Sequence, residues 1–236
     1  MRQETAPAAP SRGCDHTQGF ARPGEPLVKA LGSTDYVATW RAMQAFTAAR
    51  TDSTADEIWL TEHPPIYTLG LAGRREHLLR DTGIPVLKVD RGGQITYHGP
   101  GQLVVYVMLN LKRYGIGVRT LVRVIEASVI QLLDSYDIKG YGRIDAPGVY
   151  LRRASTEAKI AALGLKVRNG CTYHGLALNQ DMDLSPFADI DPCGYKGLAV
   201  TQLKDVGVAA PRAEIEARLV AAFSTALHAF SAKGLA

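Results

Sequence analysis

The spacing of apolar residues along the chain predicts three helices. Residues 33–50 begin with Ser33, Thr34 and Asp35, which favour helix N-termini, and continue with apolar side chains close to helical spacing. Residues 211–233 form another predicted helix, which a proline at position 211 can open. The strongest pattern lies in residues 119–138, where apolar residues recur three or four positions apart, at Leu121, Val122, Ile125, Val129, Leu132 and Leu133.

Shorter apolar runs between these helices predict strands. Residues 57–70 read as a strand that breaks at Pro64-Pro65 and then resumes. Residues 85–111 read as three short strands separated by glycine-containing turns. Three more strands follow at 146–151, 158–167 and 171–180, before a long irregular stretch at 181–197. Because strands and helices do not alternate strictly, the pattern predicts a mixed α/β or α+β fold with one main sheet.

Length and composition favour one folded domain behind a polar tail. The chain has 236 residues, of which 46% are hydrophobic, enough to bury a substantial core. No apolar run reaches the 18 or so residues of a membrane span, and we expect no membrane association. Residues 1–25 are rich in Pro, Ala, Gly and polar residues and lack the apolar centre of a secretory signal. We therefore expect a disordered tail at 1–25 and a single folded domain at 26–236.

Cysteine usage and charge exclude several classes of protein. The three cysteines form no C-x-x-C pair, which argues against a disulfide framework and a zinc site and fits a reducing cytoplasm. The net charge of +4 is not gathered into a basic stripe, so the sequence does not favour nucleic-acid binding. The charge is compatible with an acidic protein partner, but a simply solvated surface explains it equally well.

Residues 90–106, "DRGGQITYHGPGQLVVY", contain the densest group of candidate binding residues. Gly92-Gly93 lets the backbone approach a ligand closely, while Arg91, Gln94 and His98 supply hydrogen-bond donors at one edge of the predicted sheet. The spacing matches neither a dinucleotide-binding fingerprint nor a phosphate-binding loop. On the glycine pattern alone, an ordinary hairpin with tight turns is the commoner explanation.

The tetrapeptide Thr-Tyr-His-Gly occurs twice, at 96–99 and 172–175. Chance explains so short a repeat. Alternatively, two strands end at one cavity and each presents a histidine and bare backbone to it. A histidine pair also suggests a metal, but no third ligand follows at a recognisable spacing, so we do not expect a metal site.

Cys193 and Lys159 are the remaining candidates for chemistry. A free cysteine is more often a small buried hydrophobe than a nucleophile, and this interpretation suits Cys171, which leads into a predicted strand. Cys193 differs because it lies in a polar loop between proline and glycine, and reactive thiols occupy such partly exposed places. Strand lysines usually only improve solubility, but Lys159 lies in an otherwise small and apolar run. A desolvated amine there can take a proton from a thiol or, as an ammonium, hold a thiolate by charge.

Together these segments resemble one family, the lipoyl(octanoyl) transferases, or octanoyl-acyl-carrier-protein:protein N-octanoyltransferases. The matching segments run in the family's order from about residue 57 to residue 203: "EHPPIYTLG", "DRGGQITYHGPGQLVVY", "GVYL", "AKIAALGLKV", "NGCTYHGLALN" and "DPCGYKGLAVTQL". The resemblance implies the fold of biotin/lipoate protein ligases, a mixed sheet flanked by helices that is related to class II synthetase catalytic domains.

The resemblance also implies the site and its substrates. Cys193 and Lys159 match the family's catalytic dyad, in which the cysteine carries the acyl group as a thioester and the lysine activates it and moves protons. The implied substrate-binding residues are Arg91, Gly92, Gly93, Gln94, Ile95, Thr96, Tyr97, His98, Ala162, Leu163, Gly164, Gly175, Leu176 and Ala177. The acyl donor would be octanoyl-acyl carrier protein, which presents its acyl group on a phosphopantetheine arm. The acceptors would be lipoyl domains of 2-oxoacid dehydrogenase E2 subunits and the glycine-cleavage H protein. We expect a cytoplasmic monomer that uses no ATP, metal or other cofactor.

Two other functions remain open at this point. An ATP-dependent lipoate or biotin ligase of the same fold shares a related Arg-Gly-Gly segment and lysine strand but needs no cysteine nucleophile. A non-catalytic acyl-protein binder would keep the pocket and not the dyad. Cys193 and the "YHGPGQ" turn favour the transferase over the ligase, whereas substitution of Cys193 and Lys159 would separate the transferase from the binder.

Overall fold

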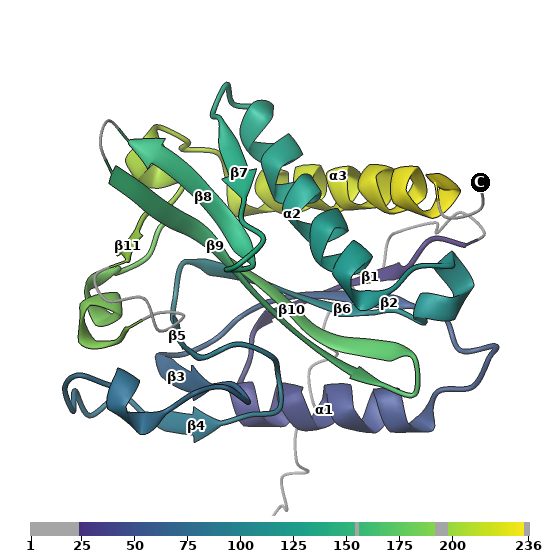
Figure 1. The fold of residues 1–236 in the computed structure, drawn as a ribbon, viewed down its shortest axis with the longest axis horizontal. Helices are drawn as coiled ribbons and strands as arrows, with labels where there is room; N and C mark the ends of the chain where they lie inside the picture. The colour runs from purple at the N-terminus through teal and green to yellow at the C-terminus, as the bar shows by residue number, and fades with distance from the viewer. Residues whose placement is uncertain (1–23, 154–155, 192–197, 234–236) are drawn as a thin grey trace, which may run out of the picture.

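The computed structural model describes residues 24–153, 156–191 and 198–233 of the chain (Figure 1). The expected tail at 1–25 lies almost wholly outside these residues, so that expectation stays a prediction. All three predicted helices are present, as α1 (Tyr36–Ala49), α2 (Val118–Asp134) and α3 (Arg212–Lys233). Asp35 caps α1 by accepting a hydrogen bond of 2.8 Å from the Ala38 N–H, as its position before the apolar pattern predicts.

A large mixed sheet of eight strands forms the centre of the molecule. Its order is β1-β2-β6-β10-β9-β8-β7, and β11 pairs with β9 beside this path. The strands are β1 (Leu27–Ser33), β2 (Glu57–Glu62), β6 (Gln102–Met108), β7 (Gly140–Gly142), β8 (Gly148–Arg153), β9 (Thr156–Arg168), β10 (Cys171–Asn179) and β11 (Ala199–Val200). The predicted main sheet is confirmed, although the apolar pattern had not indicated β1, β7 or β11.

A second, three-stranded sheet corrects the expectation of a strand that merely resumes after Pro64-Pro65. It has the order β4-β3-β5, with β3 (Ile66–Leu69), β4 (Val86–Lys88) and β5 (Ile95–His98). Proline lacks the N–H that a continuous ladder needs. The two halves of residues 57–70 therefore belong to different sheets, β2 to the large one and β3 to the small one.

The two faces of the large sheet are covered differently (Figure 1). Helices α2 and α3 pack together over one face, and the main hydrophobic core lies between them and the sheet. Helix α1 covers part of the opposite face, where Met43 packs against Trp59, Tyr106 and Tyr173. The small sheet lies beside α1 on that same side of the molecule (Figure 1).

Gly175 allows two central strands to approach closely. A Cβ atom at this position would lie 2.0 Å from the carbonyl oxygen of Val105 on the neighbouring strand β6. Any side chain would push β10 away from β6, so glycine is required here for packing as well as for the open surface beside it.

Candidate functional site

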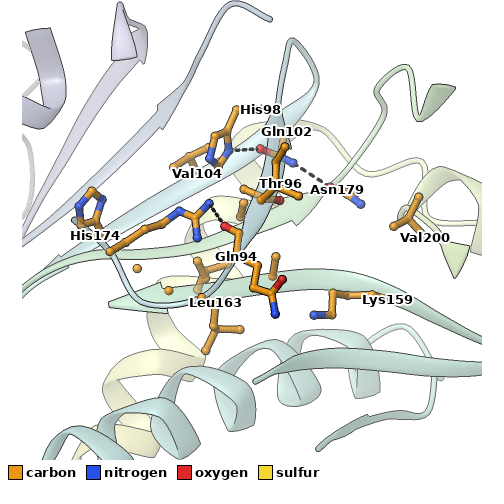
Figure 2. A pocket seen from close by; sticks show the side chains of 18 of the residues that line it. Gln94, Thr96, His98, Gln102, Val104, Lys159, Leu163, His174, Asn179 and Val200 are labelled. Carbon is orange, nitrogen blue, oxygen red and sulfur yellow. Dashed lines mark hydrogen bonds between the residues drawn. The ribbon is translucent and has the colours of Figure 1, made fainter. Parts of the chain in front are cut away.

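A pocket lies on the face of the large sheet opposite α2 and α3, where β5, β9 and β10 come together (Figure 2). It is lined by 13 of the residues predicted from the sequence: Arg91, Gly93, Gln94, Ile95, Thr96, His98, Lys159, Ala162, Leu163, Gly164, Gly175, Leu176 and Ala177. Gly92 and Tyr97 do not line it. The Gly92 N–H donates to the Leu165 carbonyl at 2.9 Å, and Tyr97 is buried against Phe187 in the core of the small sheet.

Two of the predicted segments are partners across the β9–β10 ladder. Gly164 pairs with Gly175, Leu163 with Leu176, and Ala162 with Ala177. The two leucines belong to the core beneath the sheet, and Figure 2 shows the side chain of Leu163 pointing toward the helices. The room above the sheet comes instead from the small residues at the alternate positions, since side chains alternate between the faces of a strand.

Arg91 holds the segment from Gly92 to Gln94 over the sheet. Its buried guanidinium donates to the Thr68 carbonyl at 2.7 Å, to the Thr68 hydroxyl at 2.9 Å and to the Gln94 carbonyl at 2.9 Å. These bonds use the planar fork of the guanidinium to connect a strand of the small sheet with the loop beside the pocket. Arg91 therefore shapes the pocket wall through the backbone it holds.

The two histidines of the repeated tetrapeptide line the same pocket, one from β5 and one from β10. His98 stacks on Tyr36, with ring centroids 5.5 Å apart, and its Nδ1 lies 2.7 Å from the Gln102 Oε1. Gln102 also donates to Asn179 at 2.9 Å, which ties β6 to β10 (Figure 2). Burial, together with the nearby His63, lowers the pKa of His98 to about 3, so this ring is neutral at neutral pH.

His174 depends on Asp90, which the motif analysis did not single out. The Asp90 carboxylate accepts hydrogen bonds from Trp40 at 2.8 Å, from Gln44 at 3.2 Å and from the Tyr173 hydroxyl, and its Oδ1 lies 2.9 Å from Nε2 of His174. Burial opposes ionisation of Asp90, but these four hydrogen bonds hold its pKa well below the ordinary value. The His174 Nε2 therefore carries the donated proton. His174 also adopts a left-handed backbone with φ of 61°, a strained conformation for a residue other than glycine.

Lys159 lies in the pocket wall on β9, and only 3% of its surface is exposed. Its Nζ lies 4.9 Å from the ring centroid of Tyr150 on the neighbouring strand β8. On its other side β9 pairs with β11, where Val200 is the partner of Lys159 and the Thr201 N–H donates to the Lys159 carbonyl at 3.0 Å. The segment that contains Cys193 thus leads into a strand bonded to β9 at Lys159.

Cys193 itself lies outside the described residues, so its pairing with Lys159 stays a prediction. Cys171 is buried at the start of β10, in keeping with the packing role expected for it. Across the described ranges, no group of three or more His, Cys, Asp or Glu side chains is placed to hold a metal ion.

Several residues outside the predicted substrate-binding set also line the pocket. They are Tyr36, Gln102, Val104, Tyr106, His174, Asn179, Phe187 and Val200. The repeated tetrapeptide was the one signal that pointed to His174. Tyr36 reaches the pocket from α1, Phe187 from a short 3-10 helix at Ser185–Asp189, and the others from paired strands, and local patterns do not reveal these arrangements.

Comparison with known proteins identifies the family. The model of the lipoyl protein ligase A/B catalytic domain matches residues 35–224. The chain belongs to this family. An octanoyltransferase from Dechloromonas aromatica is 62% identical over 183 residues, which cover 78% of this chain and 87% of the relative. An octanoyltransferase from Thiobacillus denitrificans is 56% identical over 86% of this chain and 91% of the relative. The resemblance to octanoyltransferases is confirmed, and the chain is an acyltransferase.

Solved structures confirm the predicted fold. A bipartite lipoate protein ligase from Thermoplasma acidophilum, studied together with its E2 lipoyl domain, matches with a TM-score of 0.70 at 16% identity over 86% of this chain and 84% of that one. A lipoate-protein ligase A bound with ATP matches with a TM-score of 0.69, also at 16% identity, over 86% of each chain. A biotin protein ligase from Aquifex aeolicus matches with a TM-score of 0.52 at 16% identity, over 87% of this chain and 70% of that one. In the part of the chain that the structure describes, no helix is both long and apolar enough to cross a lipid bilayer.

Proposed function

We propose that this protein transfers an octanoyl, or lipoyl, group from acyl carrier protein to a lysine of lipoyl domains, through a thioester on Cys193. This transfer would be the first step of endogenous protein lipoylation. The observation that carries the proposal is the buried amine of Lys159 in the wall of a pocket lined by small residues, within a chain up to 62% identical to octanoyltransferases.

In the first half-reaction, Lys159 accepts the proton of the Cys193 thiol, and the thiolate attacks the carbonyl carbon of the donor thioester. A new C–S bond forms to Cys193, the C–S bond to the phosphopantetheine arm breaks, and the departing thiolate takes the proton back from Lys159. One thioester replaces another, so the step is close to balanced in free energy.

In the second half-reaction, the amine of the acceptor lysine attacks the same carbonyl carbon while Lys159 removes a proton from the amine. A C–N bond forms, the C–S bond to Cys193 breaks, and the cysteine sulfur recovers a proton. Because an amide is more stable than a thioester, this step drives the overall reaction. No ATP is needed, and none of these steps calls for a metal or other cofactor.

The acyl chain would occupy the space above Ala162 and Ala177. These residues are partners across β9 and β10, and their small side chains leave the sheet surface open. Each buried methylene contributes about 0.8 kcal/mol, so we expect graded discrimination between chain lengths rather than an absolute limit.

Intact-mass measurement tests the proposal. The protein is mixed with octanoyl-acyl carrier protein without ATP, and its mass is followed over time. We expect an octanoyl adduct in the wild type and in Cys171→Ser, a matched loss of a thiol, but none in Cys193→Ser. A strict requirement for ATP would instead indicate a ligase. Full transfer activity in both Cys193→Ala and Lys159→Ala would remove the dyad from the mechanism.

A further inference from the structure

Glu126, on α2, lies close enough to Lys159 for the two charges to interact, although no sequence motif pointed to it. Its Oε1 accepts a hydrogen bond of 3.0 Å from the Gly148 N–H, which joins the helix layer to the start of β8. Glu126 is partly buried at this contact. Its side chain thus leaves the solvated face expected for a helix glutamate and reaches toward the sheet.

Gly148 also lies beside the end of the Lys159 side chain. A Cβ atom on Gly148 would lie 3.1 Å from the Cε and 3.3 Å from the Nζ of Lys159, and φ of 148° at this position favours glycine. The same residue therefore donates its N–H to the Glu126 carboxylate and lies beside the end of the lysine side chain. Glu126 and Lys159 also interact electrostatically.

Two further groups near the amine, Tyr150 and Arg143, are held in place. Tyr150, whose ring lies beneath the Lys159 Nζ, donates its hydroxyl to the Ala146 carbonyl at 2.8 Å. The Arg143 guanidinium lies 5.4 Å from the same ring, but it forms ion pairs with Asp145 and Glu157. Its positive charge is thereby offset.

We propose that Glu126 is a positioning residue for Lys159: its carboxylate holds the Gly148 peptide against the lysine amine and stabilises the positive charge that the amine gains on accepting a proton. The inference rests on the proposed function, in which Lys159 is the proton acceptor. A carboxylate close to an ammonium favours the charged form, and the effect is larger where water is partly excluded.

The electrostatics of Glu126 agree with this role. Burial raises the pKa of Glu126, while the Gly148 N–H and the charges of Arg123 and Lys159 oppose that rise. Arg123 is exposed on the same helix, so its charge is screened by water. Lys159 is the buried one of these two cations.

Two substitutions separate the charge of Glu126 from its hydrogen bond. Glu126→Gln keeps an oxygen that can accept from the Gly148 N–H but removes the charge, whereas Glu126→Ala removes both. Asp134→Asn is the matched control, because it removes one carboxylate from the same helix where the partner is the exposed Lys139. Thermal unfolding of each variant establishes that it is folded.

Two readouts are measured from pH 6 to pH 9: the rate of octanoyl adduct formation with octanoyl-acyl carrier protein, and the alkylation of Cys193 by iodoacetamide, quantified on its peptide. Glu126→Gln is expected to slow adduct formation about tenfold at neutral pH and to move the alkylation profile about one unit to higher pH. Glu126→Ala is expected to be slower still, and Asp134→Asn should match the wild type.

The outcomes distinguish the inference from the function on which it rests. A wild type that forms no adduct on Cys193 overturns the proposed function. A wild type that forms the adduct, with Glu126→Gln matching Asp134→Asn in both readouts, overturns only the inference about Glu126. A slower Glu126→Gln with an unshifted alkylation profile also overturns it, because the effect would then be structural.

Discussion

Replacing Asp90 by asparagine tests whether this carboxylate organises the pocket wall. Asp90 accepts hydrogen bonds from Trp40 and His174 on Oδ1 and from Gln44 and Tyr173 on Oδ2, and only 24% of its side chain is exposed. Asparagine keeps one acceptor oxygen and turns an NH2 group toward the other two donors. At least two charge-assisted hydrogen bonds are therefore lost or reversed.

The expected loss of stability follows from the number of hydrogen bonds that the substitution disrupts. A hydrogen bond to a charged group contributes about 1.5–3 kcal/mol, and the Tyr173 hydroxyl can rotate to accept from the new NH2, which recovers part of the loss. We expect Asp90→Asn to lower the free energy of unfolding at pH 7 by about 2–4 kcal/mol. Urea denaturation measures this value, with Asp52→Asn, an exposed aspartate, as the matched control.

The difference in free energy of unfolding between the wild type and Asp90→Asn should also depend on pH. Because the folded-state pKa of Asp90 is depressed, its stabilisation is fully present above the unfolded pKa of about 4 and is lost as pH falls below it. This difference in free energy of unfolding should therefore become smaller as the pH is lowered from 5 to 2. A loss below about 0.5 kcal/mol at pH 7, or a gap that does not change with pH, would refute the reasoning.

Four further predictions follow from the packing and charge of the described residues. Gly175→Ala should lower the free energy of unfolding by more than about 3 kcal/mol, since its Cβ would lie 2.0 Å from the Val105 oxygen. Gly117→Ala, with no atom within 4 Å of the new Cβ, is the control, and equal melting temperatures for the two variants would contradict the argument. Ala177→Leu should move donor preference toward shorter acyl chains, by about fourfold per methylene in competition assays, and an unchanged preference would place the chain elsewhere. Because the pKa of His98 is lowered in the folded state, the unfolded state binds the proton first, and the free energy of unfolding should fall as pH drops from about 6.5 toward 3. In urea denaturation at several pH values, His98→Gln should show a weaker dependence of this free energy on pH. Association with acyl carrier protein, measured by stopped-flow, should slow as ionic strength rises, and a rate independent of salt would count against charge steering.

Local patterns were enough for much of the fold. The apolar spacing of α2 and the capping residue Asp35 predicted helices because both signals act within a few residues. The strand β1 escaped prediction because nearly all of its residues are exposed, so it lacks the alternation that marks a half-buried strand. The prolines at 64–65 were seen as a break, but a break does not indicate which sheet each half joins.

Site residues were predictable where they belong to one continuous segment, and were missed where their role depends on contacts with residues far away in the sequence. Residues 91–98 and the glycine-containing strands stood out through unusual composition. Asp90 and Gln102 lie inside a segment that stood out, but the sequence did not indicate their roles, because these come from partners 50 or more positions away, such as Trp40 and Asn179. Glu126 is likewise hidden within a helical pattern that explains the residue without reference to Lys159.

The central position of β6 has a consequence for biosynthesis. Every residue of this strand, "QLVVYVM", is buried between β2 and β10, and none is charged. Its partner β10 begins 63 residues after β6 ends (171 − 108). At a synthesis rate of about 5–20 residues per second, the apolar edge of β6 waits about 3–13 s for its partner to leave the ribosome. During that interval the nascent chain presents an uncharged β-strand to other chains, so slower expression or added chaperone should raise the soluble yield.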